Sequence, residues 1–174
     1  MRFQVEGPFE LDRNEKGLID STASTRRAYW DWVEEFSPEL PDACGCYIFS
    51  IRASRGSLPW YIGKAERQTF RKECLSAHKI VHFNNVVVGR KGKPELFFLP
   101  QITGAGRYRS PTTTQRRAIQ ELESLLIGMA IQRNPKLSNI AGTKWLQNLT
   151  VDGFLNSLKT RSGAAKELRT LFGE

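Results

Sequence analysis

The chain has 174 residues, of which 40% are hydrophobic and 25% are charged, as is usual for one globular domain with small extensions. No apolar run approaches the roughly 20 residues that cross a bilayer, and the acidic N-terminal residues do not form a secretory signal, so we expect a cytoplasmic protein with no membrane partner. The three cysteines form no CxxC pair, which favours reduced thiols over a disulfide framework.

The net charge of +8 is unevenly distributed along the chain. Residues 1 to 40 hold 5 Lys or Arg against 9 Asp or Glu, whereas residues 41 to 174 hold 21 against 9. A basic excess of this size indicates a polyanionic partner through non-specific attraction. We therefore expect the chain to bind nucleic acid, with DNA as the first candidate.

The first half of the chain predicts an arm, a helix and two strands. Residues 1 to 20 have no clear period and are expected to form an extended arm. Residues 21 to 36 predict a helix capped by Ser24 or Thr25, with aromatic residues three and four positions apart. Two antiparallel strands are expected next, on either side of a turn; they span residues 47 to 52 and 59 to 62.

A second helix is expected to begin after Thr69 and to run from residue 70 to about 82, with one apolar side that comprises Phe70, Cys74, Ala77 and Val81. Strand segments then follow on either side of a basic turn, at residues 84 to 88 and 95 to 103.

Residues 115 to 132 predict the clearest helix, with an inward face of Ile119, Leu122, Leu126, Met129 and Ala130. The tail, residues 144 to 172, is expected to hold one or two short helices. Together these elements indicate an α+β fold with a small antiparallel sheet.

Two short motifs on the first two predicted strands each place a tyrosine beside a glycine: Gly45-Cys46-Tyr47 and Tyr61-Ile62-Gly63. Lys64 follows the second motif, Arg71 lies ten residues after Tyr61, and a later helix carries Glu123 before a Leu-Ile pair. Pro135 and Asn139 come after that helix.

Residues 43 to 139 of the chain, which carry these motifs, resemble the GIY-YIG nuclease superfamily, with Cys46 in place of the isoleucine of its name. The resemblance implies a three-stranded antiparallel sheet flanked by helices, and a divalent-metal-dependent DNA endonuclease. It also implies that Gly45, Gly63 and Asn139 are structural motif residues. The expected organisation is an N-terminal arm and helix (1–42), a nuclease core (43–140) and a helical C-terminal extension (141–174), packed as one compact unit.

The residue types in these motifs suit phosphodiester hydrolysis. Glu123 could supply a hard oxygen ligand to Mg²⁺ or Mn²⁺, and Arg71 could hold a phosphate through two parallel hydrogen bonds. A positive charge at Lys64 would favour a tyrosine phenolate. By resemblance to the family, Tyr47 and Tyr61 flank the attacking water, and we slightly favour Tyr47 as the base. The alternative is that both tyrosines are simply packed in the core.

Glu123, rather than Glu121, is the candidate metal ligand. Glu121 lies four residues after Arg117 and suits a solvated ion pair, whereas Glu123 lies at the edge of the buried helix face, where a lone carboxylate is costly. His78 lies seven residues after Arg71 and could face the substrate or be an ordinary solvated histidine. The spacing of Cys74, His78 and His82 leaves a zinc site as a minor alternative.

Phosphate contacts are expected from basic residues in turns and loops, namely Arg67, Arg90, Lys91, Lys93, Arg107 and Arg109. A homodimer, or a protein partner bound through either extension, is compatible with the sequence. The functional alternatives are a DNA-binding or regulatory module of the same fold that does not cleave, a structure-specific repair nuclease, a mobile-element nuclease, or a nuclease that acts on RNA. A restriction or defence role is the setting we favour.

Overall fold

The computed structural model of the chain describes residues 1–54, 56–114, 116–138 and 162–171. The chain divides into two compact units, Met1–Asn139 and Ile140–Glu174. Of the second unit, the structure describes one helix, α6 (Gly163–Leu171). Among the described helices of both units, none is long and apolar enough to span a membrane.

The first unit is built around an antiparallel sheet whose central strand is β3 (Gly45–Ala53). On one side β3 pairs with β4 (Gly56–Ala65), and on the other it pairs with β5 (Lys93–Ile102). The strand order β1-β5-β3-β4 makes β4 an edge strand. The predicted strands 47 to 52, 59 to 62 and 95 to 103 are therefore confirmed; the first two are longer at both ends, and the third begins at Lys93 and ends at Ile102.

The expected three-stranded sheet is too small, because the N-terminal arm also joins it. Strands β1 (Arg2–Phe3) and β2 (Glu6–Glu10) run one after the other along the outer edge of β5. An unpaired edge of β5 would expose a row of backbone donors and acceptors, and the arm covers them. Odd positions from Met1 to Leu11 are apolar or glycine and even positions are polar, charged or proline, a strand-like alternation that the expectation of an irregular arm overlooked.

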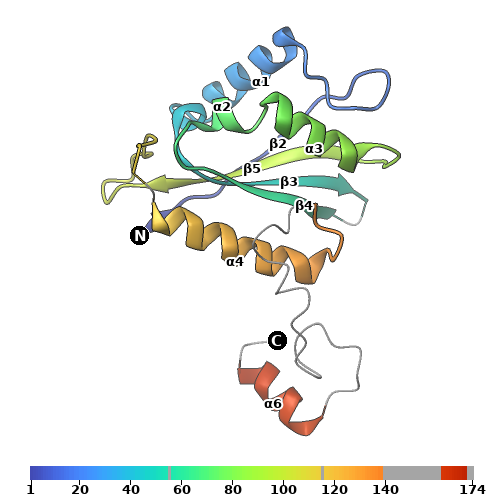
Figure 1. The fold of residues 1–174 in the computed structure, drawn as a ribbon, viewed down its shortest axis with the longest axis vertical. Coiled ribbons are helices and arrows are strands. Elements are labelled where there is room, and N and C mark those ends of the chain that lie inside the picture. Colours follow the sequence, from blue (N-terminus) through green and yellow to red (C-terminus); the bar gives the residue numbers. More distant parts are fainter. Residues whose placement is uncertain (55, 115, 139–161, 172–174) are drawn as a thin grey trace. The chain divides into compact units, whose positions relative to one another are not determined.

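Helices cover both faces of the sheet, as Figure 1 shows. On one face lie α1 (Ala23–Phe36), α2 (Phe70–Glu73) and α3 (Ala77–Val87), and on the other lies α4 (Arg117–Arg133). The larger core lies under the first three helices, and a smaller core lies under α4. The fold is thus α+β with an antiparallel sheet between two helical layers.

The helix predicted at residues 21 to 36 is confirmed as α1, but its N-cap differs from the prediction. The side-chain oxygen of Thr22 accepts a hydrogen bond from the backbone N–H of Thr25 and so caps the helix. Ser24 and Thr25 both lie within the first turn. Several residues of this segment suit a cap, and spacing alone does not choose among them.

The single helix expected at residues 70 to 82 is two helices, separated at residues 74 to 76. This break changes which side chains face inward: Phe70 and Cys74 are buried as expected, but Ala77 and Val81 are exposed. In the second helix, Ile80 and Phe83 are buried instead.

The strand expected at residues 84 to 88 is wrong, because α3 continues to Val87. The run of valines there favours a strand by propensity. Its placement in the core decides otherwise: Phe83, Val86 and Val87 are three and four residues apart and form one buried helical stripe. The amide oxygen of Asn84 accepts a hydrogen bond from the backbone N–H of Ile19, which ties this helix to the N-terminal arm.

The helix predicted at residues 115 to 132 is confirmed as α4, with part of its inward face as expected. Ile119 and Ala130 are buried, and Leu122 and Leu126 pack partly buried against the smaller core. Met129 is an exception, since it is 61% exposed.

The two motif glycines allow close approach between strands. A Cβ on Gly63 would lie 2.5 Å from the hydroxyl oxygen of Tyr47, and a Cβ on Gly45 would overlap the carbonyl oxygen of Leu99 on β5. Real Cβ contacts do not come this close, so any side chain at either position requires the neighbour to move. The glycines let the Tyr47 ring and the β5 backbone lie directly against bare main chain.

We expect Gly63→Ala to lower the free energy of unfolding by about 1 to 3 kcal/mol, because the added methyl group overlaps the buried Tyr47 ring. Urea unfolding measures this change. Gly104→Ala is the matched control: nothing lies within 4 Å of its Cβ position, so its effect should stay below about 1 kcal/mol. Equal effects of the two substitutions would contradict the packing role of Gly63.

Candidate functional site

The two motif tyrosines lie side by side on one face of the sheet. Tyr47 on β3 is paired with Gly63 on β4, and Tyr61 lies two residues before that glycine, so both tyrosine side chains leave the same face. Their rings are stacked with centroids 6.1 Å apart and planes 22° apart. Both rings belong to the larger core, under α1, α2 and α3.

Three polar side chains complete a hydrogen-bonded cluster around these rings. The Lys79 ammonium donates to the Tyr61 hydroxyl at 2.7 Å and lies 3.1 Å from a carboxylate oxygen of Glu73. The Tyr47 hydroxyl donates to the same Glu73 oxygen through a long bond of 3.5 Å, and the Gln68 amide donates to the other. We call these five residues, Tyr47, Tyr61, Gln68, Glu73 and Lys79, the tyrosine network.

Two members of the tyrosine network, Tyr47 and Lys79, have raised pKa values for different reasons. Burial, with the nearby Cys74, Tyr61 and Glu73, raises the pKa of Tyr47 well above its ordinary value. Burial alone would lower the pKa of Lys79, but its interactions with Tyr61 and Glu73 outweigh that effect and raise the pKa. Tyr47 therefore stays protonated and Lys79 stays charged at neutral pH, and the charged ammonium is bound to Tyr61.

Glu73 and Lys79 are residues of the site that the sequence analysis missed. In a continuous helix, residues six apart are rotated by about 120° from one another, so the predicted helix 70 to 82 would have pointed them to different sides. The break between α2 and α3 removes that constraint and brings the two side chains together. The six-residue spacing of Glu73 and Lys79 does not by itself predict a contact, and the helix break is what allows the two side chains to pair.

Glu123 lies on the opposite face of the sheet from the tyrosines. Lys64 follows Gly63 on β4, so its side chain leaves the α4 face, where its ammonium lies 2.5 Å from the Glu123 carboxylate. Cys46, paired with Lys64, also lies on this face and donates to the carbonyl oxygen of Ile119 on α4. Lys64 and Glu123 are thus brought together, but apart from Tyr47 and Tyr61.

Arg71 is directed towards the N-terminal part of the chain. Its guanidinium lies 3.2 Å from the Glu34 carboxylate on α1 and 3.8 Å from that of Asp42, in the short helix η1 (Leu40–Asp42). It also lies 5.9 Å from the centroid of the Trp30 ring. Its side chain remains 37% exposed, so a phosphate could still reach one edge of it.

The two histidines of α3 form a pair on its exposed side. The Nε2 atoms of His78 and His82 lie 3.1 Å apart, and the His82 ring lies 5.9 Å from that of Tyr61. Burial, His78 and Lys79 lower the pKa of His82. Cys74 is fully buried and belongs to the larger core, so it does not join the histidines in a zinc site. Within the described ranges, no group of three or more His, Cys, Asp or Glu side chains could hold a metal ion.

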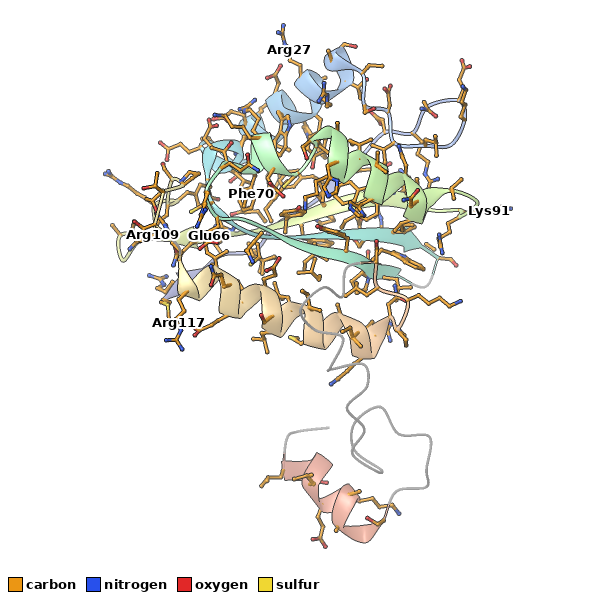
Figure 2. The ribbon with its side chains drawn as sticks, in the orientation of Figure 1. Arg27, Glu66, Phe70, Lys91, Arg109 and Arg117 are labelled. Atoms are coloured by element: carbon orange, nitrogen blue, oxygen red, sulfur yellow. The ribbon has the colours of Figure 1, made fainter. Side chains whose placement is uncertain are left out.

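The predicted DNA-binding residues do not form one patch. Arg67, Arg107 and Arg109 are exposed, but Figure 2 shows Arg109 and Lys91 at opposite ends of the sheet. Lys93 is 2.9 Å from the Glu10 carboxylate, so its charge is already balanced. Asn139 lies outside the described residues.

Glu121 makes the surface ion pair that its spacing predicts, with its carboxylate 2.7 Å from the Arg117 guanidinium.

Comparison of the chain with models of known families, with curated proteins and with solved structures finds no match. The geometry of the tyrosine network and the spacing of the motifs are thus the observations that bear on function.

We expect Tyr47→Phe to change how stability depends on alkaline pH. Because the Tyr47 pKa is raised in the folded chain, the unfolded chain loses this proton first, and the wild-type free energy of unfolding falls as pH rises above about 10. This contribution reaches about 1.4 kcal/mol per pH unit at most and is absent from the variant.

Urea unfolding of both proteins at about pH 8 and about pH 10.5 tests this expectation. Groups common to both proteins cancel, so the difference between the two free energies should shift in favour of the variant at the higher pH. A difference that stays constant would mean that Tyr47 ionises equally easily in the folded and unfolded chains.

Proposed function

We propose that the chain is a GIY-YIG-type endonuclease that hydrolyses phosphodiester bonds in DNA with the help of Mg²⁺ or Mn²⁺. The observation that carries the proposal is the pairing of the two motif strands. It places Tyr61 beside Tyr47, with the Tyr61 hydroxyl 2.7 Å from a lysine ammonium. The ammonium is an opposite charge beside the position that a Tyr61 phenolate would occupy while it takes a proton from an attacking water.

Tyr61 is the better candidate for the general base. Tyr47 is fully buried, and its raised pKa opposes the phenolate form. Tyr61 lies on the edge strand β4, and the Lys79 ammonium at its hydroxyl would stabilise a phenolate there. Tyr47 then acts as a packed neighbour that positions the Tyr61 ring, which reverses the preference drawn from the motifs.

The candidate catalytic residues lie on both faces of the sheet, which restricts where a substrate can bind. Tyr61 and Lys64 are three residues apart on the edge strand β4, and their side chains leave opposite faces. A phosphate must therefore approach this edge to be reached from both sides. Arg71, still partly exposed, could then hold a phosphate oxygen.

Glu123 is the candidate metal ligand. Hydrated Mg²⁺ often uses only one or two protein carboxylates, and Glu123 could supply one once Lys64 releases it. When bound, such an ion supplies positive charge to the phosphoryl and leaving oxygens.

A binding module that does not cleave DNA is the second candidate, and specific contacts favour it. The Glu123 carboxylate is bound to Lys64, and the Arg71 guanidinium is bound to Glu34. Each of these charges is balanced within the protein, as in a purely structural ion pair. Cleavage assays separate the two candidates.

We expect wild-type protein to nick supercoiled plasmid with Mg²⁺ and to lose this activity in EDTA. Tyr61→Phe and Glu123→Gln should each lower the rate by at least about 100-fold, since one removes the base and the other the metal ligand. Glu121→Gln is the matched control, because that carboxylate lies on the same helix but in a surface ion pair. A wild-type protein no faster than Glu123→Gln would leave the binding module as the function.

Lys79→Met should reduce the nicking rate at about pH 7 by roughly 10-fold or more, because the phenolate of Tyr61 loses its ammonium partner. Lys79→Arg keeps the charge and should retain most of the rate.

Lys72→Met serves as the control for Lys79→Met, since Lys72 is exposed. If Lys72→Met or Lys79→Arg loses the same factor as Lys79→Met, the charge of Lys79 does not act in the chemistry.

A further inference from the structure

A second candidate site lies at the end of the β3–β4 hairpin, away from the tyrosine network. It is a cavity of about 390 Å³ between the hairpin, the turn after α3 and the C-terminal end of α4. Its main lining residues are Ile51, Leu58, Trp60, Arg90, Lys91 and Arg133. Figure 1 shows these three segments meeting at one end of the sheet, and Figure 2 places Lys91 at its tip.

The charge around this cavity is positive. Arg90, Lys91 and Arg133 are all exposed, and none of the described residues that line the cavity is acidic. Within the described part of the chain, none of these three cations forms an ion pair, in contrast to Lys93 and Arg52, which pair with Glu10. Three unbalanced cations at one opening would attract an anion such as a phosphate.

The walls of the cavity are apolar and include an aromatic ring. Ile51 and Leu58 line it together with Trp60, whose ring centroid lies 4.2 Å from the guanidinium carbon of Arg90. This stacked pair offers a flat surface of the kind on which nucleic-acid bases stack. The Arg90 guanidinium also donates to the backbone carbonyl of Val86, so the arginine is held in place.

The size and chemistry of the cavity together restrict its ligand. A volume of this size is at the small end of ligand pockets, which suits a single nucleotide. A nucleotide presents a flat base and a phosphate, matching the apolar wall and the cationic rim. A base that is paired within a duplex is stacked between its neighbours, so it could not enter the cavity.

We propose that this cavity binds one unpaired nucleotide, with its base against the Trp60–Arg90 stack and its phosphate at Lys91 and Arg133. The nucleotide is either free or part of a nucleic-acid strand, since both present the same chemistry. This inference rests on the proposed function only in taking nucleic acid as the partner. It does not require that the chain cleaves.

Binding to the full-length protein in EDTA tests the proposal without cleavage. Calorimetric titrations compare a thymidine trinucleotide, a trimer of abasic sugar-phosphates of equal charge, and thymidine monophosphate. Wild-type protein should bind the thymidine trinucleotide about 10-fold more tightly than the abasic trimer, because a stacked base adds affinity. Trp60→Leu should remove that difference, and Lys91→Ala with Arg133→Ala should weaken binding of both trimers.

The matched control is Lys16→Ala with Arg27→Ala, two exposed cations outside the cavity, which should leave binding unchanged. Thymidine monophosphate binding as tightly as the trinucleotide would identify a free nucleotide as the ligand. Binding of the trinucleotide alone would identify a strand.

Equal binding of the two trimers by the wild type would overturn the proposal. So would a control variant that weakens binding as much as Lys91→Ala with Arg133→Ala. The double variants change only exposed residues, so they remain informative if Trp60→Leu does not fold. A protein that fails to nick plasmid but still prefers the base-bearing trimer would overturn the nuclease proposal and leave this one standing.

Discussion

The contact between the Tyr47 ring and the bare backbone of Gly63 is the constraint on which the arrangement of the site depends. It is compatible with only one register of β3 against β4, and a shift of one residue would turn every side chain to the opposite face. In this register Tyr61 meets Tyr47, and Lys64 points away from both. The tyrosine network and the Lys64–Glu123 pair are therefore fixed on opposite faces by one packing contact.

Ion pairs link the acidic N-terminal part of the chain to its basic part. The N-terminal part is acidic, and its carboxylates pair with cations of the basic part: Glu10 with Arg52 and Lys93, and Glu34 with Arg71. The Glu10 pairs link the arm to β3 and β5, and the Glu34–Arg71 pair links α1 to α2. They also occupy three cations, so the 21 Lys or Arg of residues 41 to 174 overstate the positive charge available to a ligand.

Exposed cations lie at both ends of the sheet. Lys91 marks one end and Arg109 the other, so a polyanion that contacted both would have to extend along the whole unit. The edge strand β4 runs between these ends and carries Tyr61 and Lys64 on its two faces. A strand of nucleic acid following this edge would meet the proposed catalytic residues between the two basic regions.

The sequence by itself determined the motif strands, the main helices and the pairing of Glu121 with Arg117, because these depend on local spacing and periodicity. Only the tertiary structure decided that the arm pairs with the outer edge of β5, that the valine run after Asn84 is helical and that Glu73 meets Lys79. It also decided that Glu123 and the tyrosines lie on different faces. These outcomes depend on contacts with distant parts of the chain or on a helix break, which local spacing does not determine.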